Sequence, residues 1–121
     1  MAKLDAAELA AFYADYIDAW NRRDLETYYS LYAASLVFRD GSTVLHGIDA
    51  LRNRYEAELR DYPDLTMECV RLFVDVDSQA IAAENIERAT SIELRGALFL
   101  TLDPEGRISE MSEYMAADRA S

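Results

Sequence analysis

Apolar residues follow a helical spacing through the first third of the chain. Large apolar side chains recur every three or four residues over roughly residues 5–22, which predicts an amphipathic helix. Asp5 and Glu8 form a capping-box pattern at its start. After a polar break, Asp24 can cap a second helix, which would carry Leu25, Tyr28, Tyr29, Leu31 and Tyr32.

The next segment combines a short strand with a third helix. Residues 36–38 are apolar and end in Arg39-Asp40-Gly41-Ser42, a turn pattern that predicts the end of a strand. A third helix is expected after Gly47, with Ile48, Leu51, Tyr55 and Leu59 on one face. Pro63 ends the helical half of the chain.

From Leu65 onward the pattern becomes extended. The predicted strands are 65–76, 79–90, 91–102 and 107–115, with turn residues at 75–78 and 103–106. Helices followed by hairpin-connected strands indicate an α+β fold, in which the helices pack on one face of a curved antiparallel sheet. With 121 residues and no linker or repeat, the chain is expected to form a single domain over 1–121.

Composition excludes several classes of function. Acidic residues outnumber basic ones 23 to 12, giving a net charge of -11, which disfavours nucleic acid as a partner. No apolar run approaches the roughly 20 residues that span a membrane, and no signal-peptide pattern is present, so a cytoplasmic location is expected. Cys69 and His46 have no companions at metal-ligand spacing, and no phosphate-binding glycine loop occurs. We therefore expect no metal and no cofactor.

Three phenols and one carboxylate suggest acid/base chemistry. Tyr16, Tyr32, Asp40 and Tyr55 each occur where an apolar element meets a turn or carries other aromatic residues. A carboxylate can remove a proton from carbon beside a carbonyl, and a phenol can donate a hydrogen bond to the resulting enolate oxygen. Asp40 precedes Gly41, however, so it could equally serve to shape a hairpin turn.

Three segments carry a family resemblance, namely residues 16–25 (YIDAWNRRDL), 45–51 (LHGIDAL) and 103–108 (DPEGRI). Together with the order of elements, they make nearly the whole chain resemble the nuclear transport factor 2-like superfamily. Within it, the chain looks most like bacterial ketosteroid isomerases and SnoaL-like polyketide cyclases. The resemblance implies a cone-shaped, strongly bent mixed or antiparallel sheet, closed by three N-terminal helices around a pocket.

The resemblance also implies roles for individual residues. Tyr16 matches the phenol that binds the substrate oxygen in the isomerases, and Asp40 matches their general base. Tyr32 and Tyr55 match phenols that some isomerases connect to the first by hydrogen bonds. The second oxyanion donor of the isomerases, a protonated aspartic acid, is replaced here by Leu98. A missing donor of this kind typically costs a hundredfold or more in rate.

The last strand offers a substitute for that donor. Strand alternation places Glu113 on one face with Met111 and Met115, the face that lines the pocket in the isomerases. If this face points inward, Glu113 could act as a neutral donor or as a second proton carrier; the opposite face could equally be the buried one. Asn85 is a weaker candidate by the same parity, and the other expected pocket residues are Trp20, Phe38, Leu98, Met111 and Met115.

Three functions remain open from the sequence. The first is a cofactor-independent enzyme that acts on a mostly apolar carbonyl compound by isomerisation or cyclisation. The second is an epoxide hydrolase of the limonene type, for which Arg71 or Arg95 would have to point inward. The third is a module that only binds a small ligand or dimerises. A homodimer is expected because predicted strands 65–76 and 91–102 carry apolar residues on both faces.

Overall fold

The three helices form where the capping and apolar patterns predict them. In a computed structural model, which describes residues 2–117, they are α1 (Ala6–Asn21), α2 (Leu25–Ser30) and α3 (Ile48–Asp61). Asp5 caps α1, because its side chain accepts from the backbone N–H of Glu8 at 2.8 Å while the Glu8 side chain accepts from the Asp5 N–H at 3.0 Å. Asp24 caps α2 through the N–H of Thr27.

Six strands form one mixed sheet. They are β1 (Tyr32–Asp40), β2 (Thr43–His46), β3 (Thr66–Asp75), β4 (Ala80–Ala89), β5 (Ile92–Leu102) and β6 (Ile108–Ala117), in the spatial order β2-β1-β6-β5-β4-β3. Neighbours are antiparallel except β1 and β6, which run parallel. The sheet does not close, so β2 and β3 remain its edges.

The sequence expectation is wrong at two points between α2 and α3. Tyr32 does not belong to the second helix, which ends at Ser30; it begins β1, whose first residues pair with β6. The segment after the Asp40-Gly41 turn is strand β2, which the sequence pattern does not reveal because the strand has four residues and none of them is buried. Short edge strands carry little alternation, so tertiary pairing decides them.

The C-terminal end of α1 is bound to the start of β3 by polar side chains. The Trp20 indole donates to the carbonyl of Leu65 at 3.0 Å, and the Asn21 amide bridges the backbone N–H and C=O of Met67 at 2.8 Å each. The Arg23 guanidinium donates to the carbonyls of Trp20 and Leu65. These contacts tie the helical layer to the far edge strand of the sheet.

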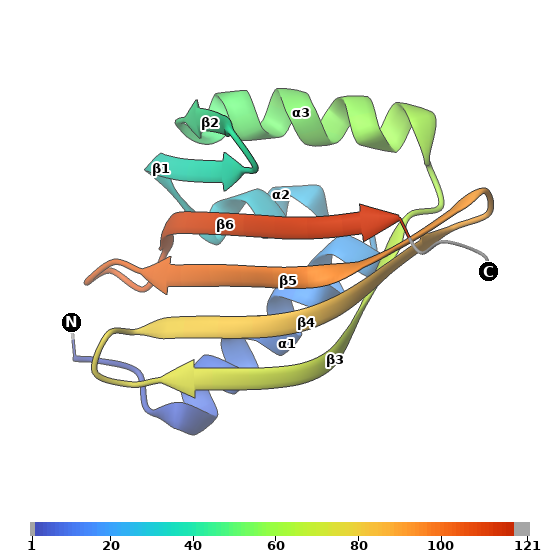
Figure 1. Cartoon of the computed structure of the whole chain (residues 1–121). Coiled ribbons are helices and arrows are strands. Elements are labelled where there is room, and N and C mark those ends of the chain that lie inside the picture. Colours follow the sequence, from blue (N-terminus) through green and yellow to red (C-terminus); the bar gives the residue numbers. More distant parts are fainter. Residues whose placement is uncertain (1, 118–121) are drawn as a thin grey trace.

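Helices cover one face of the sheet and leave the other open. Figure 1 shows α1 and α2 behind the strands and α3 along the β1–β2 edge. The buried core lies between these helices and the inner sheet face and is rich in aromatic rings. Among residues 2–117, no helix is both long and apolar enough to cross a membrane.

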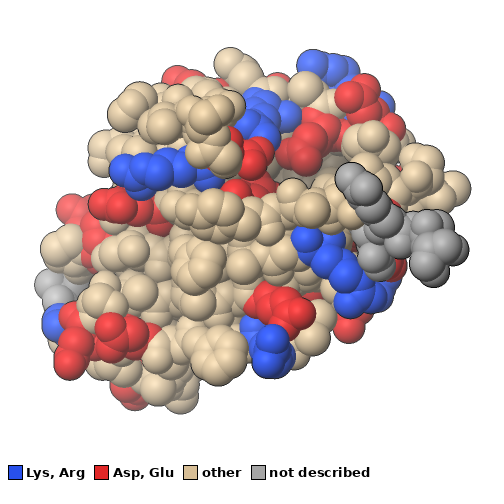
Figure 2. Space-filling view, viewed as in Figure 1, with Lys and Arg blue, Asp and Glu red and all other residues tan. Residues whose placement is uncertain are grey.

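The outer face of the sheet is largely uncharged across its middle, as Figure 2 shows. Four large apolar side chains there are about half exposed or more, namely Val70, Phe73, Phe99 and Tyr114. A register shift between Cys69 and Arg71 allows Val70 and Phe73 both to be exposed despite their odd spacing. Exposed apolar residues grouped in this way usually mark an interaction surface.

Gly96 permits a close approach between β5 and β6. A Cβ atom at this position would lie 1.8 Å from the Tyr114 carbonyl oxygen and 2.8 Å from the Met115 Cα. Both obstructing atoms belong to the backbone, so no side-chain rotation can relieve the clash. The lack of a side chain at residue 96 is therefore a requirement of this strand pairing.

We expect Gly96→Ala to lower the free energy of unfolding by roughly 3 kcal/mol or more, because the two strands must separate to admit the methyl group. Urea denaturation followed by circular dichroism measures the change. Ala97→Gly, one residue along the same strand, is the control and should cost no more than about 1 kcal/mol. Equal stabilities of Gly96→Ala and the parent protein would contradict the close approach.

Candidate active site

A small cavity lies between the helices and the inner face of the sheet, at the end of β4 that contains Glu87. Its volume is about 10 Å³, room for a single water-sized group. Its walls are mostly aromatic and apolar but include three carboxyl groups; they are Tyr16, Trp20, Tyr28, Tyr55, Glu58, Leu65, Met67, Glu87, Leu98 and Glu113. The cavity thus combines one predicted oxyanion donor with several acids.

Three phenol hydroxyls form a closed triangle beside this cavity. The Tyr16 hydroxyl lies 2.8 Å from that of Tyr28 and 2.8 Å from that of Tyr32, and the last two lie 2.7 Å apart. The Met111 sulfur lies 3.7 Å from the Tyr16 oxygen. Tyr16 comes from α1, Tyr28 from α2 and Tyr32 from β1, so the triangle joins three elements.

One hydroxyl of the triangle can turn its hydrogen bond toward the cavity. Three hydroxyl protons can satisfy all three edges when each phenol donates to the next. If Tyr16 instead donates into the cavity, Tyr28 and Tyr32 can both donate to it, which strengthens Tyr16 as a donor to negative charge. Burial is the main cause that raises the pKa of each of these phenols, so all three stay protonated near neutral pH.

Tyr55 lies in the cavity wall but outside the hydrogen-bond network expected for it. It lines the cavity and contacts Trp20 and Phe38 edge-on, with ring centroids 5.5 and 6.2 Å away. Among the described residues, no hydrogen bond joins its hydroxyl to the triangle. The third member of the network is Tyr28, which the sequence pattern presents only as one more apolar helix position.

Glu113 faces the cavity directly across from Leu98. The two residues are register partners on β6 and β5, so they share the inner face of the sheet. The Glu113 side chain is buried and has no hydrogen-bond or ion-pair partner within residues 2–117. Burial, followed by the nearby charge of Glu87, raises the pKa of Glu113 to about 8. At neutral pH this carboxyl group is mostly protonated and can donate a hydrogen bond.

Two further acids line the same cavity. Glu87 on β4 is 7% exposed and likewise lacks a hydrogen-bonded or ionic partner in the described part of the chain. Burial and the charge of Glu58 raise its pKa to about 7. Glu58 on α3 is half-buried, and desolvation raises its pKa although Arg54 opposes the effect.

Asp40 lies next to Glu113 but outside the cavity wall. The two are register partners on the parallel strands β1 and β6. The Asp40 carboxylate pairs with the guanidinium of Arg54, and both side chains are about one-third exposed. Arg54 in turn lies over the Phe38 ring, 5.3 Å from its centroid. Whether Asp40 acts as the base therefore stays a prediction.

The remaining residues predicted for the pocket divide between its wall and the surrounding core. Trp20 and Leu98 line the cavity. Phe38, Asn85 and Met111 are fully buried but lie behind the wall, and Met115 is half-buried beyond it. Asn85 donates its amide N–H to the Tyr13 hydroxyl, whose ring stacks on Tyr16 at 5.4 Å. Asn85 thus supports the ring of Tyr16 from behind.

The arginines required by the epoxide hydrolase alternative lie on the surface. Arg71 is exposed and pairs with Glu84 at 2.7 Å, and Arg95 is exposed beside Glu93. Neither guanidinium reaches the cavity, so the inward orientation that this alternative demands is wrong for both.

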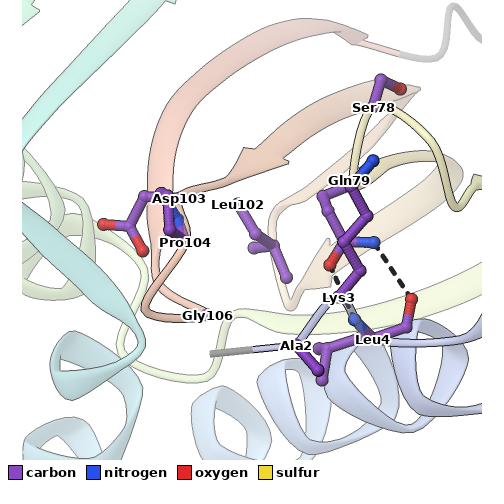
Figure 3. Close-up of a pocket in the computed structure, with 9 residues that line it drawn as sticks. All are labelled: Ala2, Lys3, Leu4, Ser78, Gln79, Leu102, Asp103, Pro104 and Gly106. Atoms are coloured by element: carbon purple, nitrogen blue, oxygen red, sulfur yellow. Dashed lines mark hydrogen bonds between the residues drawn. The ribbon is translucent and has the colours of Figure 1, made fainter.

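Other parts of the described chain offer less chemistry. No group of three or more His, Cys, Asp or Glu side chains within residues 2–117 is placed to hold a metal ion. A second hollow of about 260 Å³ lies at the opposite end of β4, between the N-terminal segment and the turns before β4 and β6 (Figure 3). Gln79 there donates to and accepts from the Leu4 backbone. This hollow contains no buried ionisable group.

Two signals could have identified the acids that the sequence analysis missed. Glu87 follows Asn85 by two residues, so the parity that suggested Asn85 also places Glu87 on the inner face. Glu58 follows Tyr55 by three residues on one helix face. The presence of Tyr28 in the triangle has no such signal, because it depends on how α2 meets β1.

The fold and the cavity define a cone-shaped α+β domain of the nuclear transport factor 2-like kind. The sequence model of the SnoaL-like domain matches residues 5–111. The chain belongs to the SnoaL-like domain family. No curated protein matches the chain in sequence.

Solved structures share this fold at low sequence identity. SalBIII, an epoxide hydrolase/cyclase-like enzyme with a role in pyran ring formation in salinomycin, has a TM-score of 0.80 and 19% identity over 93% of each chain. A candidate ketosteroid isomerase from Kribbella flavida has a TM-score of 0.74 and 21% identity over 93% of this chain and 81% of its own. A candidate polyketide cyclase from Sinorhizobium meliloti has a TM-score of 0.75 and 17% identity over 92% of this chain and 100% of its own.

The buried acids predict an unusual dependence of stability on pH. Because the pKa values of Glu87 and Glu113 are raised to about 7 and about 8, the folded protein binds more protons than the unfolded chain between pH 4.5 and 8. The free energy of unfolding should therefore fall by up to a few kcal/mol as the pH rises through this window. Urea denaturation at several pH values measures it.

Glu113→Gln should remove much of this slope, whereas Glu110→Gln, an exposed change on the same strand, should leave it intact. A parent protein whose stability increases steadily from pH 5 to 8 would contradict the shifted pKa values.

Proposed function

We propose that the protein is a cofactor-independent acid/base enzyme that acts on a small, mostly apolar carbonyl compound. The carbonyl oxygen would enter the cavity and accept hydrogen bonds from the Tyr16 hydroxyl and from the neutral carboxyl group of Glu113. Asp40 would remove a proton from the carbon beside the carbonyl. The observation that carries the proposal is the unpaired, buried Glu113 carboxyl opposite Leu98, in one cavity with Tyr16.

The proposed reaction transfers a single proton. The Asp40 carboxylate takes the proton, and the electrons of the broken C–H bond form an enolate, whose oxygen is held by Tyr16 and Glu113. Asp40 can then return the proton to a different carbon, which is an isomerisation. Alternatively, the enolate carbon can attack a second carbonyl group of the same molecule, which closes a ring, and the alkoxide that forms takes the proton back from Asp40.

Burial and charge favour these roles. Tyr16 is protonated and supported by two further phenols, so it can donate without ionising. Arg54 pairs with the Asp40 carboxylate and fixes its position on β1 beside Glu113. The small cavity suits the oxygen atom of a substrate, and the rest of the molecule would lie at the mouth. Asp40 would reach the substrate there, on the side of β1 next to Glu113.

Variants of Glu113 test its role as a donor. On a simple probe, the conversion of 3-cyclohexenone to 2-cyclohexenone measured by absorbance, Glu113→Gln should retain activity within about tenfold because its amide can still donate. Glu113→Ala should lose roughly a hundredfold. The parent rate should fall as the pH rises through about 8, where Glu113 ionises, and the Gln variant should lose this dependence. A Gln variant as inactive as the Ala variant would argue against the donor role.

Tyr16→Phe should reduce turnover of the same probe by roughly a hundredfold or more, since it removes the principal hydrogen-bond donor.

Asp40→Asn should abolish exchange of the substrate proton with deuterium while leaving binding nearly unchanged. Asp49→Asn is a matched control, because Asp49 is an exposed acid at the start of α3 that does not line the cavity, and it should have no effect. If exchange is lost in Glu87→Gln but not in Asp40→Asn, the base is Glu87, and the proposed role of Asp40 is wrong.

One observation favours a second candidate function, a non-catalytic ligand-binding or dimerisation module. Tyr16, Trp20, Tyr28 and Tyr55 fill much of the space between helices and sheet and leave about 10 Å³. If the parent protein catalyses no proton exchange on ketone probes at any pH from 5 to 9, this second function is the better account.

We also propose that the protein is a homodimer built on the outer face of the sheet. Val70, Phe73, Phe99 and Tyr114 support it, since together they expose apolar surface from three strands. Burying such an apolar surface between two copies would stabilise the dimer by about 25 cal/mol for each Å² removed from water. A second copy of the same sheet face is a self-complementary partner.

Light scattering at micromolar concentration should give twice the mass of the 13.7 kDa chain. Phe73→Glu should shift the mass to that of a monomer, whereas Ala11→Glu, on the exposed side of α1, should not. A monomeric parent protein would refute the proposed dimer.

A further inference from the structure

The proposed reaction leaves two of the cavity acids without a role. Glu87 is only 7% exposed, and within residues 2–117 nothing donates a hydrogen bond to its carboxyl group. Glu58 approaches from α3 on the same cavity and also lacks a hydrogen-bonded partner in the described chain. A buried carboxyl group without a partner is costly unless a ligand compensates it.

The charges around this pair are predominantly negative. Glu113 on β6 and Asp40 on β1 are the neighbouring acids, and the nearby cation, Arg54 on α3, is bound to Asp40. Arg23 lies over the Trp20 ring from outside, where carbonyl groups hold it. Neither arginine forms an ion pair with Glu87 or Glu58 in the described structure.

The size of the cavity and the carboxyl groups in its wall indicate which kind of cation fits. The acids do not form a cluster able to hold a metal ion among the described residues. The cavity has room for one water-sized group between aromatic walls. A primary ammonium group has this size, carries three N–H donors, and its organic stem can pack on Trp20 and Tyr55.

We infer that Glu87 and Glu58 bind a primary ammonium group on an organic ligand, so that the protein takes amine-bearing compounds. This inference goes beyond the proposed function: because the cavity has room for one such group, the ammonium group would occupy it in place of a carbonyl oxygen, and amines are a second class of ligand for the same site. Binding requires no turnover, so the two proposals can fail separately.

Three probes of similar shape test the inference by calorimetry at pH 8. Benzylammonium should bind at least about tenfold more tightly than benzyl alcohol, which has the same ring and a neutral head. Benzyltrimethylammonium should bind at least about tenfold more weakly than benzylammonium, because its head exceeds the cavity. Equal binding of the two cations would indicate general attraction to an acidic protein and overturn the inference, as would equal binding of benzylammonium and benzyl alcohol, or no binding of either.

Variants and pH separate the site from the rest of the acidic surface. Glu87→Gln and Glu58→Gln should each reduce the preference for benzylammonium about tenfold. Glu84→Gln should not, because Glu84 is a half-exposed acid on β4 that pairs with Arg71. Affinity should rise as the pH increases from 6 to 8, because Glu87 must lose its proton to bind a cation, and binding at pH 7 should release protons to the buffer. An unchanged preference in both cavity variants overturns the inference.

The outcomes also distinguish this inference from the proposed function. Retained benzylammonium preference together with no proton exchange by the parent protein would refute the enzyme proposal alone. Proton exchange that depends on Glu113 and Tyr16, without any preference for benzylammonium, would refute the amine inference alone.

Discussion

The hydroxyl triangle of Tyr16, Tyr28 and Tyr32 is the constraint on which the candidate site depends. Three phenol oxygens are buried together, and each would be costly without a partner. Because each satisfies the other two, α1, α2 and β1 must meet at one point. This meeting point places Tyr16 and Tyr28 together in the wall of the cavity.

Burial on this scale changes the chemistry of the acids nearby. Glu113 and Glu87 are buried in a cavity wall rich in aromatic rings, where the charged form of a carboxylate is poorly solvated. Their pKa values rise, and as a result these two acids lower the free energy of unfolding near neutral pH. Such a loss of stability is typical of residues retained for binding or catalysis rather than for folding.

Under the proposed function, the acid at residue 113 takes the place of a donor that the resemblance assigns to the neighbouring strand. Leu98 occupies the position where the resemblance to isomerases leads one to expect a protonated acid. The carboxyl group of Glu113 lies on the adjacent strand in direct register, so the inner face of the sheet still presents one acid at that level. Adjacent strands place register partners about 5 Å apart, close enough for one to replace the other.

The sequence by itself determined most of the elements and which residues share a strand face. Helical spacing predicted α1 and α3, capping residues placed the starts of α1 and α2, and alternation placed Glu113 and Met111 on one side of β6. These features are local, because they depend on residues a few positions apart. The tertiary structure alone decided that Tyr28 rather than Tyr55 joins Tyr16, that Arg54 binds Asp40, and that β2 forms. Each of these contacts joins separate elements, and their meeting is set by the bend of the sheet and the packing of the core, which no local pattern encodes.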